Sequence, residues 1–387
     1  MSVPGTPLFQ SFFSGGFECS THRRADNRRL DLVAATAHDA HVVADYRRLR
    51  ELGIRTVREG IRWHLIEPAP GRYDFSTVRP VLVAARELGV QVIWDLCHYG
   101  WPDDLDIFSP AFVDRFARLA HAFARLLASE TDDVPFLCPI NEISFLAWAG
   151  GEMGFINPFG LARGHELKAQ LIRAAIAAIE AIWEIDRRAR ICHVDPVFHV
   201  IPDPSRPEDA PAAEAFRLAQ YQGWDMLAGR QRPELGGRTA YLDIIGVNYY
   251  AYNQWTYVDD RDGGPTIPRT HPAYRPFREI LAEVYARYGR PLFVAETGAE
   301  GEARADWLRY VGSETRAARD AGVAVHGICL YPIVNFPGWD DDRHCLNGLW
   351  DYADARGERE LHGPLADELR RQQALLEGST EPRASWI

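Results

Sequence analysis

The segment "FLCPINEIS", residues 136–144, joins an apolar run to two polar side chains. A short run of Phe, Leu, Cys and Ile is typical of a strand buried on both faces, which is the kind that parallel sheets contain. Asn141 and Glu142 come at the end of this run. The segment therefore predicts a buried strand that presents an amide and a carboxylate at its carboxyl end.

Apolar runs of this kind alternate with amphipathic helical stretches along the whole chain. The predicted strands span residues 12–19, 54–61, 90–98, 134–142, 191–199, 242–250, 291–297 and 325–331. The predicted helices span residues 38–52, 76–89, 109–128, 165–189, 211–229, 272–289, 303–321 and 363–377. Eight strand–helix units without a break in composition predict a single (β/α)8 TIM barrel of the α/β class over residues 1–377, with residues 378–387 as a flexible tail.

The main alternative to the barrel is a doubly wound open sheet. That fold would require a glycine-rich phosphate-binding turn after an early strand. The segment "SGGFEC" at 14–19 does not match the G-x-G-x-x-G pattern. The pattern therefore favours the closed barrel, in which functional side chains project from the carboxyl ends of the strands.

Composition excludes several classes of function. The 387 residues carry a formal net charge of −11 and no basic cluster, so nucleic-acid binding is not expected. The N-terminus lacks the pattern of a signal peptide, and the most apolar segment, 168–185, is interrupted by Arg173 and Glu180. We expect a cytoplasmic protein that does not cross a membrane. The six cysteines are scattered singly with no CxxC spacing, so a zinc site or disulfide framework is not expected, and most of them are expected in the core.

The use of basic residues excludes one kind of catalysis. Forty-two of the 43 basic residues are arginine, and the only lysine is Lys168, expected on the solvent side of a helix. Schiff-base chemistry requires a lysine in the active site. Aldolase-like and pyridoxal-dependent functions are therefore not expected.

Polar and aromatic residues gather at the predicted strand ends, which share one rim in a barrel. They are His22, Arg58, Glu59, Arg62, Trp63, His98, Tyr99, Trp101, Asn141, Glu142, His193, Asp195, Asn248, Tyr249, Tyr250, Glu296, Asn335 and Trp339. Polar groups bind sugar hydroxyls and flat rings pack against sugar C–H faces, so this set predicts a carbohydrate site.

Two of these residues suggest a mechanism. Glu142 and Glu296 end the fourth and seventh strands, which can face each other across the barrel. Retaining glycosidases hold two carboxyl groups about 5–5.5 Å apart. The pair is therefore predicted to cleave a glycosidic bond.

Metal sites are not expected from the sequence. His193 and Asp195 could supply two ligands, but no further ligands follow at matching spacing. The segment "DDRDGG" at 259–264 begins like a calcium loop and lacks the glutamate at loop position 12, so it is interpreted as a turn. The predicted reaction requires no metal and no organic cofactor.

Six motifs, in their order and spacing from about residue 12 to 352, resemble glycoside hydrolase family 1, the β-glucosidase-like retaining enzymes. They are "VREGIRWHLIEP" (57–68), "WDLCHYGWPDDL" (94–105), "PINEISFLAWAGGEMGFINPF" (139–159), "IIGVNYYAYN" (244–253), "PLFVAETG" (291–298) and "NFPGWDDD" (335–342). The resemblance implies that Glu142 is the proton donor and Glu296 the nucleophile. It implies substrate-binding positions for His22, Arg58, His98, Asn141, Asn248, Tyr250 and Trp339.

The sequence departs from the family at positions where family members bind the sugar hydroxyls that lie far from the anomeric carbon. His22 stands where a glutamine is usual, Thr297 replaces an asparagine, and Pro337-Gly338 replace a glutamate. Ordinary glucoside or galactoside specificity is therefore not expected. We expect a retaining β-glycosidase acting on a β-glycoside or small oligosaccharide, and the open alternatives are a transglycosidase with the same carboxylates and a non-catalytic sugar-binding barrel.

The predicted mechanism assigns different protonation states to the two carboxyl groups. We expect Glu296 to be ionised beside Arg58 and Tyr250. We expect Glu142 to be kept protonated by burial and by the negative charge of Glu296.

Overall fold

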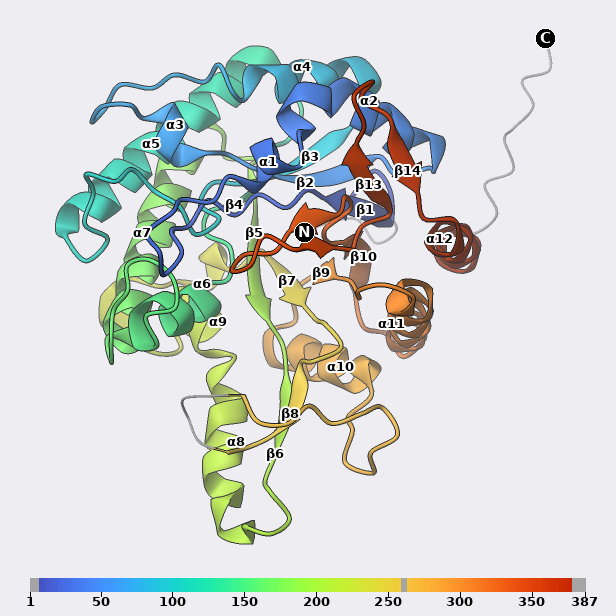
Figure 1. Ribbon diagram of the computed structural model, residues 1–387. Helices are drawn as coiled ribbons and strands as arrows, with labels where there is room; N and C mark the ends of the chain where they lie inside the picture. The colour runs from blue at the N-terminus through green and yellow to red at the C-terminus, as the bar shows by residue number, and fades with distance from the viewer. Residues whose placement is uncertain (1–6, 259–262, 378–387) are drawn as a thin grey trace.

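Eight parallel strands form a closed barrel surrounded by helices (Figure 1). The computed structural model describes residues 7–258 and 263–377. The barrel strands are β1 (Phe13–Gly16), β2 (Thr56–Gly60), β3 (Gln91–Asp95), β4 (Phe136–Cys138), β5 (Arg190–Pro196), β7 (Ile244–Asn248), β9 (Leu292–Thr297) and β10 (Val325–Leu330). Each strand pairs in parallel with its neighbours in chain order, and β1 closes the ring by pairing with both β2 and β10. The predicted TIM barrel is confirmed.

The predicted strands correspond to these eight strands but are longer at most of their ends. The segment predicted at 134–142 forms a strand only over Phe136–Cys138. Beyond it the backbone turns, and the amides of Asn141 and Glu142 donate to the carbonyl groups of Cys97 and Val194. The side chains of Asn141 and Glu142 therefore lie just after the strand, where the backbone no longer forms the regular hydrogen bonds of the sheet.

Helices cover the outside of the barrel (Figure 1). The longer ones are α2 (His38–Glu51), α4 (Arg79–Leu88), α5 (Pro110–Glu130), α7 (Gly164–Ile185), α8 (Ala210–Ala219), α9 (Gln222–Leu227), α10 (Phe277–Tyr288), α11 (Ala303–Asp320) and α12 (Gly363–Leu376). The short ones are α1 (Leu32–Ala35), α3 (Trp63–Ile66), α6 (Ile143–Leu146) and a π-helix (Ala147–Glu152), with 3-10 turns at Pro207–Asp209, Pro233–Leu235 and Thr239–Tyr241.

Helix α5 illustrates how the sequence sets a helix and its packing. It begins after Ser109 with Pro110, whose missing N–H costs nothing in the first turn. Phe112, Phe116 and Phe123 recur at helical spacing and are fully buried, the first two against Trp63 and the third against Trp94 of β3. Burial of this apolar stripe, rather than local propensity, holds the helix in place.

Three two-stranded sheets are separate from the barrel sheet. They pair β6 (His199–Ile201) with β8 (Gln254–Thr256), β11 (Phe336–Pro337) with β12 (His344–Cys345), and β13 (Trp350–Ala353) with β14 (Arg359–Leu361). The first of them projects from the barrel together with α8 (Figure 1). The helix predicted at 211–229 is therefore two helices, because α8 packs on this projection whereas α9 packs on α7.

Apolar side chains fill the amino-terminal half of the barrel. Phe9 packs there against Phe136 and Phe293, with ring centroids 5.6 and 5.1 Å away. All six cysteines, at positions 19, 97, 138, 192, 329 and 345, are buried and unpaired, as predicted. The amino-terminal half is thus closed by packing, and the polar rim lies at the other end.

The prediction that Lys168 faces solvent is wrong. Its side chain is half-buried and Nζ donates to Gln222 Oε1 at 3.0 Å, because this side of α7 packs against α9. Burial lowers the pKa of Lys168, and Asp195 is near enough to raise it in part.

Two further sequence predictions concern parts of the chain outside the described residues. The turn predicted at 259–264 falls largely on residues 259–262, and the tail predicted at 378–387 lies wholly outside. Among the helices of the described ranges, none has both the length and the apolar character needed to cross a membrane.

A buried ionic network ties the start of the chain to its end. Asp45 on α2 accepts from His38 Nδ1 at 2.9 Å and from Arg359 Nε at 2.7 Å. His38 Nε2 also contacts Glu59 Oε1 at 3.0 Å. Burial alone would raise the pKa of Asp45, but hydrogen bonds from His38 and Arg359 outweigh it and lower that pKa to about 2. Burial alone would lower the pKa of His38, but Glu59 and Asp45 raise it to about 9.

Removal of this carboxylate should destabilise the fold. Asp45→Ala leaves Arg359 buried without its carboxylate partner and His38 with Glu59 alone, so the free energy of unfolding should fall by about 3–5 kcal/mol in denaturant titrations. Asp367→Ala, which removes an exposed partner of Arg370, is the control and should cost at most about 1 kcal/mol. Because the pKa of Asp45 is depressed, its contribution is present above about pH 4 and is lost towards pH 2. An unchanged unfolding midpoint at pH 6 would contradict the role given to this network.

Candidate functional site

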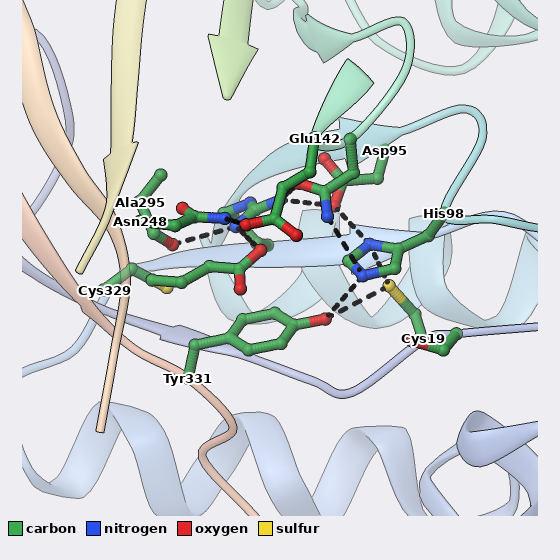
Figure 2. Close-up of polar contacts among 12 residues, drawn as sticks. Cys19, Asp95, His98, Glu142, Asn248, Ala295, Cys329 and Tyr331 are labelled. Atoms are coloured by element: carbon green, nitrogen blue, oxygen red, sulfur yellow. Dashed lines mark hydrogen bonds and ion pairs between the residues drawn. The ribbon is translucent and has the colours of Figure 1, made fainter. Parts of the chain in front are cut away.

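Several of the polar residues predicted at the strand ends converge at the carboxyl-terminal mouth of the barrel (Figure 2), whereas Glu59 contacts His38 and His193 contacts the Tyr241 carbonyl. Arg58 comes from β2, Asn248 from β7 and Glu296 from β9, whereas His98 and Glu142 follow β3 and β4. Figure 2 shows the side chains of Glu142, Asn248 and His98 turned towards a common region. Segments far apart in the sequence therefore contribute to one buried polar cluster.

Arg58 connects the members of this cluster. Its Nη1 donates to Glu296 Oε1 at 3.0 Å and to the carbonyl oxygen of Ala295 at 2.9 Å. Its Nη2 donates to Asp95 Oδ2 at 2.6 Å and to Asn141 Oδ1 at 3.0 Å. Burial alone would lower its pKa, but the carboxylates of Asp95 and Glu296 raise the pKa of Arg58 well above its ordinary value. Arg58 is therefore a permanent buried cation.

Glu296 accepts one hydrogen bond on each carboxylate oxygen. Arg58 binds Oε1, and the hydroxyl of Tyr250 donates to Oε2 at 2.8 Å. Asn248 on β7 lies opposite Glu296 in the strand register. Donors on both oxygens suit an ionised carboxylate, which is an acceptor only.

Glu142 has different surroundings, although it too accepts on both oxygens. Asn248 Nδ2 donates to Oε1 at 2.8 Å, and the hydroxyl of Tyr99 donates to Oε2. Burial, followed by the negative charge of Glu296, raises the pKa of Glu142 to about 8. This is the direction expected from the sequence, and it makes the protonated form the main one at neutral pH.

His98 is held by protein groups on both ring nitrogens. Its Nδ1 lies 3.2 Å from Asp95 Oδ2 and 3.2 Å from Cys19 Sγ. Because Asn141 Oδ1 accepts from Arg58, its Nδ2 is the atom that faces His98 Nε2 at 3.2 Å. Burial alone would lower the pKa of His98, but Cys19 and Asp95 beside Nδ1 raise it well above its ordinary value.

Cys19, Asp95 and His98 bring three possible ligand atoms within 4.8 Å of one another. The Asp95 oxygen of this group already forms an ion pair with Arg58, whose charge opposes a metal cation there. Hydrogen bonding within the protein accounts for the cluster without a metal ion.

His193 and Asp195, the pair considered from the sequence as metal ligands, do not face a common point. His193 Nε2 lies 2.9 Å from the carbonyl oxygen of Tyr241. Asp195 accepts from the backbone N–H and the hydroxyl of Ser144, both at 2.9 Å. Asp195 thus anchors the turn that follows Glu142.

An aromatic wall borders the carboxyl groups. Trp339 is half-buried and lies with its ring centroid 4.6 Å from His22, 5.8 Å from Tyr99 and 6.1 Å from Phe145. Neither ring nitrogen of His22 has a hydrogen-bond partner among residues 7–258 and 263–377. Burial, then the nearby charge of His98, lowers the pKa of His22 to about 3, so the ring is neutral at physiological pH.

The structure adds residues that the site predictions did not include. The predicted rim includes Tyr99 without a role, and it omits Asp95, which is the last residue of β3. Glu18 follows β1 and accepts from the backbone N–H of Ser20 at 3.0 Å and from its hydroxyl at 2.5 Å. Burial raises the pKa of Glu18, and both His98 and Glu296 influence it, which places this carboxyl group beside the cluster.

Comparison with known proteins gives structural matches only. No protein-family profile matches the sequence, and no curated protein does. A family 1 β-glucosidase from Thermotoga maritima is 16% identical, with a TM-score of 0.74 over 97% of this chain and 99% of the other. A β-glucosidase from the same organism in complex with glucoimidazole is 17% identical, with a TM-score of 0.73 over 96% and 99%. The AHE enzyme from Alicyclobacillus herbarius is 18% identical, with a TM-score of 0.77 over 96% and 99%.

These matches span nearly the full length of both chains, whereas the sequences have diverged widely. They therefore bear on the backbone and not on the side chains of the site. This chain adopts the (β/α)8 fold of the family 1 β-glucosidases.

Proposed function

We propose that this protein is a retaining β-glycosidase that hydrolyses a β-glycoside or small oligosaccharide by double displacement. The observation that carries the proposal is the contrast between two buried carboxyl groups in one cluster. Glu296 is bound by a guanidinium and a phenol, whereas the pKa of Glu142 is raised to about 8. A pair whose surroundings separate their protonation states is suited to divide the roles of nucleophile and acid.

In the first step, Glu296 attacks the anomeric carbon of the bound sugar. As the new carbon–oxygen bond forms, the glycosidic bond breaks and Glu142 transfers its proton to the leaving oxygen. The products of this step are a free alcohol and a glycosyl ester on Glu296. Arg58 and Tyr250 orient the attacking carboxylate through the contacts described above.

In the second step, water replaces the ester. The negative charge of Glu296 is then absent, so the pKa of Glu142 falls and its carboxylate can accept a proton from water. The water oxygen bonds to the anomeric carbon, the ester bond breaks, and Glu296 leaves as a carboxylate. Both residues are restored to their starting states.

The remaining site residues are assigned to sugar binding. Asn141 and His98 border the two carboxyl groups, and Trp339 offers a flat ring to the sugar. His22 is neutral and packs edge-on against Trp339. With Pro337-Gly338 near this wall in place of a carboxylate, we assign a glycone other than an ordinary glucoside or galactoside.

The roles of the two glutamates can be separated with azide. Glu296→Ala should abolish turnover of an activated aryl β-glycoside, and azide should restore a reaction that gives the inverted glycosyl azide, because no covalent ester forms. Glu142→Ala should lose about 10²–10⁴-fold with poor leaving groups and much less with good ones, and azide should give the retained product. Glu184→Ala, on the exposed side of α7, is the control and should keep full activity.

The substrate for this test is found by screening nitrophenyl glycosides, including deoxy, pentose and uronic sugars. Wild-type turnover in either variant would remove that glutamate from its role. Transfer of the sugar to an added alcohol in preference to water would identify a transglycosidase. Sugar binding without turnover of any glycoside would identify a non-catalytic barrel.

The coupling between the two carboxyl groups is open to direct measurement. Glu296→Gln removes a negative charge beside Glu142, so the pKa of Glu142 should fall below about 8 while burial keeps it above the ordinary value for glutamate. Carbon-13 NMR titration of labelled glutamate, with Glu142→Gln used to assign the signal, measures this pKa. A pKa of Glu142 that is the same in wild type and Glu296→Gln would show that the two groups do not interact.

A further inference from the structure

Tyr99 and Glu142 meet at the ends of neighbouring strands, and both have unusual backbone conformations. The φ angle is 67° at Tyr99 and 46° at Glu142, in the left-handed region that L side chains rarely adopt. Both side chains are buried, and the Tyr99 hydroxyl is hydrogen-bonded to Glu142 Oε2. Strained residues persist where the surrounding structure holds them, often at functional sites.

The direction of this hydrogen bond follows from its neighbours. Arg58 has only donors, so Asn141 must turn its Oδ1 to Arg58 and its Nδ2 to Tyr99, where it donates to the hydroxyl oxygen at 3.0 Å. The one proton of the Tyr99 hydroxyl is therefore free to point at Glu142 Oε2. Asn248 Nδ2 donates to the other oxygen at 2.8 Å.

These donors complement only one protonation state of Glu142. When Glu142 is a carboxylate, both oxygens accept and every donor has a partner. When Glu142 is protonated on Oε2, the Tyr99 hydroxyl must turn its own proton away in order to accept, and it loses the hydrogen bond that it donates to the carboxyl group. The hydrogen-bond network is therefore built for the ionised form, although burial and Glu296 favour the neutral form.

We propose that Tyr99 is a positioning residue that stabilises the Glu142 carboxylate, and so prepares it to act as the base in the second half of the reaction. This inference rests on the proposed function, in which Glu142 must be an acid first and a base afterwards. The Tyr99 hydroxyl keeps its own proton throughout and supplies only a hydrogen bond.

Other groups around Glu142 act on its charge from different sides. Glu296 on β9 and Asp195 on β5 are negative neighbours that raise its pKa, and the latter also has Lys168 nearby. Tyr250 and Tyr252 lie after β7 and are close enough to be influenced by Glu142. Removal of the Tyr99 hydroxyl breaks no hydrogen bond to these groups, and Asn141, which also donates to that hydroxyl, keeps its contacts with Arg58 and His98.

The decisive variant is Tyr99→Phe, which keeps the ring against Trp339, Phe145 and His98 and removes the hydroxyl. Loss of the donor should raise the pKa of Glu142 by about one unit. The alkaline limb of kcat/KM, which reports the free enzyme, should then move up by about one pH unit. For an aryl glycoside whose deglycosylation limits turnover, the acid limb of kcat should also move up, with rates on that limb about tenfold lower.

A second change at position 99 should lower the pKa of Glu142 instead of raising it. Site-specific 3-fluorotyrosine at position 99 is a stronger hydrogen-bond donor of nearly the same size, so both limbs should move to lower pH. Tyr274→Phe is the matched control, because it removes a phenol that hydrogen-bonds Tyr249 and is not among the groups that act on Glu142, and its pH profile should equal that of wild type.

The outcomes separate this inference from the proposed function. If Tyr99→Phe lowers rates at every pH without moving either limb, or if the two changes at Tyr99 move the limbs in the same direction, the inference is wrong. If wild type cleaves no glycoside, the proposed function fails, and carbon-13 titration of Glu142 still decides the inference. In that measurement, an unchanged Glu142 pKa in both Tyr99 variants would overturn it.

Discussion

The site depends on one fully buried guanidinium group. Arg58 on β2 binds Glu296, Asp95, Asn141 and the backbone carbonyl of Ala295, and these contacts join it to groups from the ends of three other strands. A buried cation with fewer partners would be very costly, so the acceptors around Arg58 are as necessary to it as it is to them. The planar fork of arginine satisfies this set, whereas a lysine ammonium could not bridge it in the same way.

The orientation imposed by Arg58 extends outwards through hydrogen bonds. It determines which way Asn141 faces, Asn141 then leaves the proton of the Tyr99 hydroxyl free to point away from it, and Tyr99 donates that proton to Glu142. The two carboxyl groups consequently have different partners. Glu296 is paired directly with the Arg58 cation, whereas Glu142 accepts hydrogen bonds from the neutral groups of Tyr99 and Asn248. This asymmetry is what divides the roles of nucleophile and acid in the proposed mechanism.

Much of the fold is readable in the sequence because each strand and helix carries its own pattern. The run before Asn141 and Glu142 predicts a buried strand, and eight such units predict a barrel whose strand ends meet. The prediction for Lys168 is wrong because its helix packs a polar side against a neighbouring helix, which no pattern in a single helix reveals. The division of residues 211–229 into two helices likewise depends on what each half packs against.

Some residues of the site can likewise be predicted from the local sequence, whereas their contacts cannot. Residues such as Glu142 and Glu296 follow strands directly and can be found by position. The contact between Tyr99 and Glu142 requires two left-handed backbone conformations and a neighbouring asparagine turned by an arginine from another strand. That arrangement exists only in three dimensions, so the sequence names the residue without indicating its partner.

The buried link between Asp45 and Arg359 makes the site sensitive to whether the chain is complete. Glu59, which contacts His38 in that network, directly follows Arg58 on β2. The network therefore holds the outer side of the strand at Glu59, one residue from the arginine that binds the groups of the site on its inner side. Arg359 is supplied from near the end of the described chain. During synthesis, His38 and Glu59 can meet early, but Arg359 can join them through Asp45 only after all eight barrel strands have been made, and a product terminated before Arg359 would lack this link.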